Sequence, residues 1–264
     1  MQGRKYGQGL DMKKPKHLTM KALVDAGAHL GHLKSRWNPK MRPYIYGTQG
    51  NTQIIDLGKT MRIYTRAEEF VRKCAQEGYQ FLFVGTKSQA QDPIFSAAQR
   101  CGAYYVNHRW LGGLLTNFQT IRQSVKKMEQ MKKQIEQESE GLSRTLTKKE
   151  LGLMRKEVSK LERSIGGIAK ARKIDRNSKF VLFIADTNVE RNAINEARKF
   201  GFPIVAIVDT NSDPDLVDYP IPANDDAAKS IHTIMSAFAE TIAEVRDNKE
   251  TIVPKEEPTE IEKN

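Results

Sequence analysis

A short segment near the N-terminus combines basic side chains with an indole ring, a combination suited to contact with nucleic acid. Lysine and arginine bind phosphates, and an aromatic ring can stack on an unpaired base. Pro39 and Pro43 exclude a continuous helix here, so we expect an extended loop. The residues that we predict to face RNA are Lys34, Arg36, Trp37, Lys40 and Arg42. Two interpretations of Trp37 stay open: its indole contacts RNA, or it fills the hydrophobic core.

A second candidate segment joins a predicted strand to a long charged helix. The strand is the apolar segment 104–106, and Arg109 and Trp110 follow it beside the glycine pair 112–113. Glycine adopts backbone angles that are closed to other residues, so such a pair suits a sharp exit from the sheet. A second glycine pair, 166–167, follows the returning helical pattern. We infer that the two pairs bracket an α-helical hairpin inserted into an α/β domain.

Basic charge is concentrated in the first part of the chain, within an overall net charge of +11. Residues 202–264 hold 5 basic and 14 acidic side chains, which leaves 38 basic and 18 acidic ones in residues 1–201. Such a basic surface attracts polyanions, and nucleic acid is the commonest partner of this kind. The competing interpretation is charge that only keeps the protein in solution.

The carboxyl edge of the predicted sheet allows a different function, a nucleotide-binding enzyme on a Rossmann-like fold. The segments at this edge would be residues 85–88, 186–188 and 209–211. A P-loop requires a glycine directly before its lysine, and Lys87 has none. The GxGxxG fingerprint of dinucleotide-binding folds is also absent. Spacing assigns no serine or cysteine nucleophile to a base, so we predict a scaffold rather than an active site.

Metal-ligating residue types are present without a recognisable ligand pattern. Asp186 and Asp209 could together hold Mg²⁺, although aspartates that follow strands more simply bond to backbone amides in turns. His29 and His32 have no cysteine or acidic partner at ligand spacing. We therefore predict no metal site and no cofactor. The two cysteines fall in helical patterns, which indicates buried free thiols in a reducing compartment.

Strand patterns alternate with helical patterns, which predicts an α/β fold with a parallel sheet and helices on both faces. Continuous apolar runs such as residues 81–84 are typical of strands buried on both faces. The predicted strands begin at Phe81, Tyr104, Phe180, Ile204 and Tyr219, in the sheet order 2-1-3-4-5. The remaining predicted elements are a short helix over 21–28, a β-hairpin over 44–57, a helix over 59–76 and a closing helix over 225–245.

The pattern of residues 118–165 predicts an antiparallel two-helix coiled coil. It lies in the crossover between the second and third predicted strands. Apolar residues recur there at spacings of three and four. Thr116 with Gln119, and Thr147 with Glu150, fit the capping-box pattern at the two helix starts. The other faces are rich in lysine and glutamate, which usually means a solvated surface. A projecting hairpin with so little apolar surface also suits docking, and our hypothesis is that it binds protein or RNA.

Ordered motifs over about residues 20–245 resemble the ribosomal protein S2 family of bacterial-type small subunits. The motifs are His29-Leu30-Gly31-His32, Arg36-Trp37-Asn38-Pro39-Lys40-Met41, Tyr44-Ile45-Tyr46-Gly47, Ile54-Ile55-Asp56-Leu57, Phe83-Val84-Gly85-Thr86-Lys87, and the stretches 104–117 and 209–226. The resemblance implies a three-layer flavodoxin-like α/β/α sandwich with an inserted coiled-coil hairpin. It also implies a place between the head and body of the small subunit, binding to small-subunit rRNA, and help in recruiting ribosomal protein S1. By resemblance, the RNA-surface candidates are Arg36, Trp37, Lys40, Arg42, Lys87, Arg109 and Trp110.

The predicted domain organisation follows from these elements. We expect a flexible basic extension over 1–19, a sandwich domain over 20–117 and 166–247, the hairpin over 118–165, and a disordered acidic tail over 248–264. No apolar run approaches the roughly 18 residues that a membrane helix needs, and the N-terminus lacks the apolar core of a secretory signal.

The function that we predict is a structural, rRNA-binding component of the small ribosomal subunit, without catalysis. Its expected partners are small-subunit rRNA and other small-subunit proteins, including ribosomal protein S1, with no membrane contact. Its expected location is the cytoplasmic, bacterial-type ribosome, and an organellar ribosome is the open alternative. The alternatives are the nucleotide-binding enzyme and a free regulatory RNA-binding protein, which would be found outside ribosomes.

Overall fold

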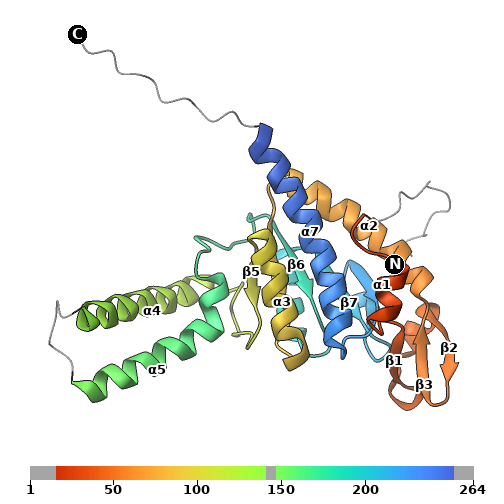
Figure 1. Cartoon of the computed structure of the whole chain (residues 1–264), viewed down its shortest axis with the longest axis horizontal. Helices are drawn as coiled ribbons and strands as arrows, with labels where there is room; N and C mark the ends of the chain where they lie inside the picture. The colour runs from red at the N-terminus through yellow and green to blue at the C-terminus, as the bar shows by residue number, and fades with distance from the viewer. Residues whose placement is uncertain (1–15, 141–146, 253–264) are drawn as a thin grey trace, which may run out of the picture.

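A five-stranded parallel sheet forms the centre of the computed structural model, which describes residues 16–140 and 147–252 (Figure 1). The strands are β4 (Gln80–Val84), β5 (Tyr104–Val106), β6 (Phe180–Ile184), β7 (Ile204–Val208) and β8 (Tyr219–Pro222). Their order is β5-β4-β6-β7-β8, and every neighbouring pair is parallel. The predicted order 2-1-3-4-5 is therefore confirmed, and with it the α/β fold. The proline-containing β8 lies at an edge, where a missing backbone donor is tolerated.

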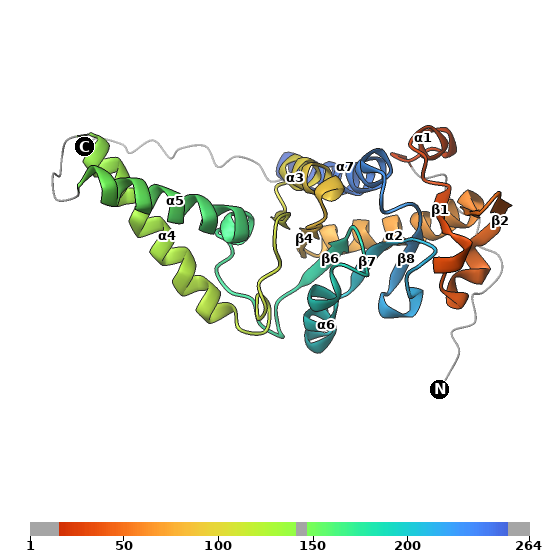
Figure 2. The same cartoon turned by 90° about the horizontal axis from the view of Figure 1, so that it is seen from below.

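Side chains on the strands alternate between two hydrophobic layers, as the period of two in a strand requires. Phe81, Phe83 and Phe183 point into the layer covered by α2 (Leu57–Gln76), α3 (Ser88–Cys101) and α7 (Ala228–Ile252). Their rings pack together, with the centroids of Phe83 and Phe183 4.5 Å apart. Leu82 and Leu182 point into the opposite layer, which α6 (Arg191–Phe200) covers (Figure 2). The result is the predicted three-layer sandwich.

A small antiparallel sheet lies beside the β8 end of the sandwich (Figures 1 and 2). It consists of β1 (Leu30–Leu33), β2 (Ile45–Gln49) and β3 (Thr52–Ile55) in the order β1-β3-β2. The predicted hairpin of β2 and β3 is confirmed, but β1 was not predicted, because its half-exposed pattern gives no periodic signal. Before β1, α1 (Met20–Asp25) ends earlier than predicted. Between β1 and β2 the chain forms two short 3-10 helices, η1 (Lys34–Arg36) and η2 (Pro39–Tyr44), rather than a fully extended loop.

The inserted hairpin is formed by α4 (Phe118–Ser139) and α5 (Lys148–Ile165), which pack side by side and project from the β5 end of the sheet (Figures 1 and 2). Apolar side chains fill the seam between the helices, among them Val125 and Met128 from α4 and Val158 from α5. The capping box of Thr147 and Glu150 is confirmed. The one predicted for Thr116 and Gln119 is wrong: Asn117 is the N-cap of α4, and its side chain makes no capping bond.

The N-terminal end of the described chain contacts α7, the helix that ends it. Leu18 is fully buried and His17 contacts two glutamates of α7, so these two residues anchor the end of the predicted extension, while residues 1–15 lie outside the described part. The helix α7 starts at Ala228, after the side chain of Asn224 has accepted hydrogen bonds from the amides of Asp226 and Ala227. It continues to Ile252, into the segment predicted to be disordered, and residues 253–264 lie outside the description. Among the helices of the described residues, none combines the length and apolar content needed to span a bilayer.

Candidate nucleic-acid interface

The N-terminal basic segment is held against the carboxyl end of β7. The amide of His32 donates to the hydroxyl of Thr210 at 2.9 Å, and the amide of Asn38 donates to the carbonyl of Thr210 at 2.7 Å. A Cβ atom on Gly31 would lie 2.5 Å from the methyl carbon of Thr210, so glycine permits this close approach. Met41 is fully buried in the layer beneath and anchors η2. The segment is therefore a fixed surface of the sandwich.

Three of the predicted RNA-facing cations on this surface remain available to a ligand. Lys34, Arg36 and Arg42 are exposed, and within residues 16–140 and 147–252 the structure gives them no ion pair. Lys40 differs, because its Nζ contacts Asp213 at 2.7 Å and Asp215 at 2.9 Å, and these carboxylates raise its pKa. Trp37 is half-buried, which leaves both of its interpretations open. The free positive charge of the segment thus comes from the other three cations.

In the second candidate segment the structure separates Arg109 from Trp110. Arg109 and its neighbour His108 are exposed, whereas Trp110 is buried in the layer beneath α6. The indole Nε1 of Trp110 donates to the carboxylate of Glu196 at 3.0 Å. Trp110 therefore packs and orients the fold, and in this structure it is not a stacking surface for a base.

Glu196 organises the whole turn between β5 and α4, a role that sequence reasoning missed. Besides the indole of Trp110, its carboxylate accepts from the amides of Gly113 at 2.8 Å, Leu115 at 2.9 Å and Thr116 at 3.1 Å. The hydroxyl of Thr116 donates to it as well, at 3.3 Å, which explains why Thr116 does not cap α4. Burial alone would raise the pKa of Glu196, but these hydrogen bonds outweigh it and hold the pKa below its usual value.

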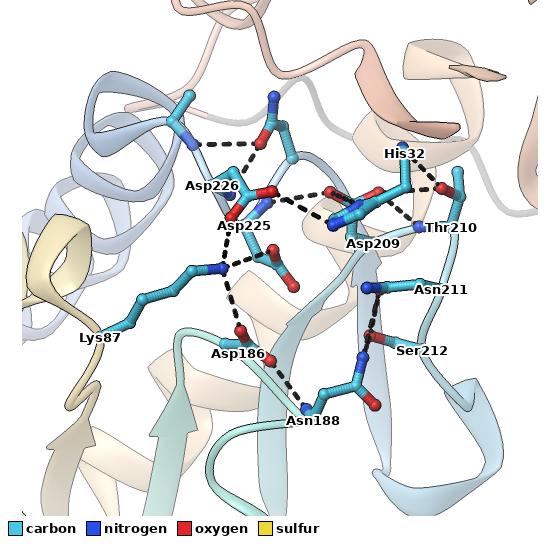
Figure 3. Close-up of polar contacts among 12 residues, drawn as sticks. His32, Lys87, Asp186, Asn188, Asp209, Thr210, Asn211, Ser212, Asp225 and Asp226 are labelled. Carbon is cyan, nitrogen blue, oxygen red and sulfur yellow. Dashed lines mark hydrogen bonds and ion pairs between the residues drawn. The ribbon is translucent and has the colours of Figure 1, made fainter. Parts of the chain in front are cut away.

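The carboxyl edge of the sheet holds an acidic cluster around Lys87 (Figure 3). Its Nζ lies 3.2 Å from Asp186, 3.3 Å from Asp225 and 2.5 Å from Asp226. Burial disfavours the charged amine, yet the surrounding carboxylates raise the pKa of Lys87 above its ordinary value. Lys87, predicted to face RNA, is thus neutralised within the protein. Three carboxylates contact this one amine, and a fourth, that of Asp209, accepts from the amide of Asp225 beside them. Together they would repel a phosphate group, which argues against the nucleotide-binding enzyme.

His32 extends this cluster and brings metal-ligating groups together. Its Nδ1 lies 3.1 Å from Asp209, and its Nε2 lies 3.1 Å from Asp226. Asp225 is 1% exposed, and its Oδ2 has no hydrogen-bond partner among the described residues. One ligand atom each from His32, Asp209 and Asp225 lie within 4.8 Å of one another, so these three residues could hold a divalent cation. The predicted absence of a metal site rested on sequence spacing, which does not reveal these partners.

The two buried cysteines make poor nucleophiles. Burial raises the pKa of both Cys74 and Cys101 to about 11, so neither thiol ionises near neutral pH. Taken with the cations and the acidic cluster described above, the described surface has two parts. Unpaired cations can contact phosphate, and the acidic edge of the sheet repels phosphate.

Comparison with known proteins agrees with this description. A family model described as ribosomal protein S2 matches residues 23–245. A relative from Geotalea uraniireducens (strain Rf4), small ribosomal subunit protein uS2, is 48% identical over 228 residues, which is 86% of this chain and 86% of that protein.

Proposed function

The chain belongs to the ribosomal protein S2 family, and from this premise we propose that it binds small-subunit rRNA between the head and the body of the subunit. As a member of this family it is a structural component of the small ribosomal subunit and not an enzyme. We also propose that it supports the recruitment of ribosomal protein S1, a proposal that rests on family membership alone.

The observation that carries the rRNA proposal is the set of unpaired cations Lys34, Arg36 and Arg42, held on one fixed surface. Phosphate contacts from lysine and arginine dominate the affinity of proteins for nucleic acid. Arg109 is a fourth exposed candidate, near the hairpin. The small sheet and the hairpin lie at opposite ends of the sandwich (Figure 2). Cations at both ends fit a protein that bridges two parts of an RNA particle.

The test is the double substitution Arg36→Ala with Arg42→Ala in the full chain. Affinity for protein-free small-subunit rRNA is expected to fall, and the slope of log K against log salt to become shallower by about 2, one unit for each lost phosphate contact. The melting temperature should stay the same, because neither side chain forms an ion pair in the described structure.

Lys40→Ala is the matched control, because Asp213 and Asp215 already neutralise this lysine. It is expected to change rRNA affinity less than the double substitution. Unchanged affinity in the double variant would remove the N-terminal surface from the interface. A wild-type chain that neither binds rRNA nor sediments with small subunits would refute the proposed function itself and favour the free regulatory protein.

A further inference from the structure

The acidic and basic side chains of α5 are used differently. Its glutamates are all engaged: Glu157 with Lys127 of α4 at 2.7 Å, Glu162 with Lys132 of α4 at 2.7 Å, and Glu150 in the capping box. Its basic side chains form no ion pair within the described residues; they are Lys148, Lys149, Arg155, Lys156, Lys160 and Arg163. The acidic side chains of α5 are therefore used in ion pairs and in the capping box within the hairpin, while its basic side chains are left unpaired among the described residues.

The two helices of the hairpin consequently present different outer faces. On α4, the stripe at helical spacing runs Lys126, Glu129, Lys133, Glu136, so opposite charges alternate along it. On α5, the stripe runs Lys156, Lys160, Arg163 and carries one sign only. Like charges at this spacing destabilise an isolated helix, so the face of α5 is not arranged for the stability of the free hairpin.

This basic stripe borders a surface hollow of about 570 Å³. The hollow is lined by Arg155, Lys156, Lys160 and Arg163 of α5 and by His108, which precedes the exposed Arg109. Ser159 and Ser164 also line it and bring hydroxyl groups to the same place. The hollow thus gathers positive charge and hydrogen-bond donors from two separate segments, the turn after β5 and α5, which is what a phosphate chain requires.

We propose that the outer face of α5, together with His108, binds the phosphate backbone of RNA. The inference rests on the proposed rRNA-binding function and adds a second contact surface to it, on the hairpin, which lies at the end of the sandwich opposite the small sheet (Figure 2). It also decides the docking hypothesis for the hairpin in favour of RNA. A protein partner would need a broad apolar contact area, and among the described residues of α5 the one large apolar side chain that is exposed beside the charged stripe is Leu153.

The test compares two sets of substitutions in the full chain, with protein-free small-subunit rRNA as the probe. Lys156→Ala with Lys160→Ala and Arg163→Ala removes the stripe on α5. Affinity at about 0.15 M salt is expected to fall roughly 10- to 100-fold, and the slope of log K against log salt to become shallower by about 2 to 3. Lys126→Ala with Lys133→Ala removes lysines from the mixed stripe on α4 and should change affinity less than about 3-fold.

The triple variant should keep the melting temperature of the wild type, since its side chains form no ion pair in the described residues. If it fails to fold, Lys156→Gln with Lys160→Gln tests the same face and should still weaken binding.

Equal losses of rRNA affinity from the α4 and α5 sets would overturn the inference, because general charge would then explain the effect. Unchanged rRNA affinity with lost uptake into reconstituted subunits would also overturn it, in favour of a protein partner. Weakening by Arg36→Ala with Arg42→Ala but not by the α5 set would leave the proposed function standing and reject only this second surface.

Discussion

The carboxylate of Glu196 accepts the indole N–H of Trp110 at 3.0 Å, across 86 residues of sequence. Both side chains are buried, with exposed fractions of 7% and 8%. The same carboxylate receives the backbone amides of the turn that follows Trp110. One side chain of α6 therefore fixes the place where the chain leaves the sheet and enters the hairpin, and it sets the position of the neighbouring Arg109.

Removing this carboxylate should destabilise the fold strongly. We expect Glu196→Ala to lower the free energy of unfolding by about 3 kcal/mol, because it leaves several buried donors without an acceptor. Urea denaturation measures the effect. Asn195→Ala, an exposed neighbour on the same helix, is the control and should stay within about 0.5 kcal/mol of the wild type. Similar values for the two variants would show that water replaces the carboxylate at no cost.

Acid should weaken the attachment of the N-terminal residues to α7. The contacts with Lys16 and His17 lower the pKa of Glu244 to about 2. A carboxylate whose pKa is lower in the folded state stabilises the fold above its unfolded pKa, near 4.3, and loses this contribution as the pH falls toward 2. We therefore expect Glu244→Gln to have a lower melting temperature than the wild type at pH 7, with a loss of about 1 kcal/mol in the free energy of unfolding. Near pH 2 the two proteins should have the same melting temperature.

Thermal denaturation over that pH range checks the prediction for Glu244. Glu69→Gln provides a control on the exposed face of α2, where the structure gives the glutamate no ion pair among the described residues. A difference between Glu244→Gln and the wild type that persists unchanged at pH 2 would contradict the linkage.

Divalent zinc should stabilise the protein through His32, Asp209 and Asp225. Zinc accepts imidazole nitrogen together with carboxylate oxygen, and within residues 16–140 and 147–252 the buried Oδ2 of Asp225 has no hydrogen-bond partner. At 100 times the dissociation constant, a ligand adds about 2.7 kcal/mol, which corresponds to several degrees of melting temperature. Asp225→Asn should abolish the zinc effect. Asp215→Asn, which alters an exposed carboxylate that pairs with Lys40 outside this cluster, should retain it, and equal responses would argue for non-specific binding.

Two glycines of the hairpin region should respond in opposite ways to alanine. A Cβ atom on Gly167 would lie 2.2 Å from the carbonyl oxygen of Tyr105, so Gly167→Ala must displace backbone and should cost about 2 kcal/mol or more. Gly152 lies inside α5, and no atom of the part of the chain that the structure describes lies within 4 Å of the place its Cβ would take. There alanine should stabilise by up to about 1 kcal/mol, through its higher helix propensity. Chemical denaturation of both variants tests the pair, and a neutral Gly167→Ala would show that β5 can shift.

Local patterns were sufficient to predict the five strands of the sheet, the hairpin and most helices. Apolar runs such as Phe81 to Val84 mark strands buried on both faces, and spacings of three and four mark the seam of α4 and α5. The residues at which helices begin and end were predicted less accurately. Thr116 fits the capping pattern by spacing, but its hydroxyl bonds to Glu196, a partner that no local pattern contains.

The sequence by itself determined the basic character of the chain, its family resemblance and the residue types available for phosphate contact, because these depend on composition and on short-range order. Only the tertiary structure decided which cations are available. The sequence predicts the same RNA-facing role for the basic side chains of Lys40 and Lys87 as for those of Arg36 and Arg42. Folding, however, places carboxylates 2.5 to 3.3 Å from the two lysine amines. Coulomb attraction depends on distance in space rather than on separation along the chain. For that reason the pairing of Lys87 with Asp226, like that of Trp110 with Glu196, follows from the fold.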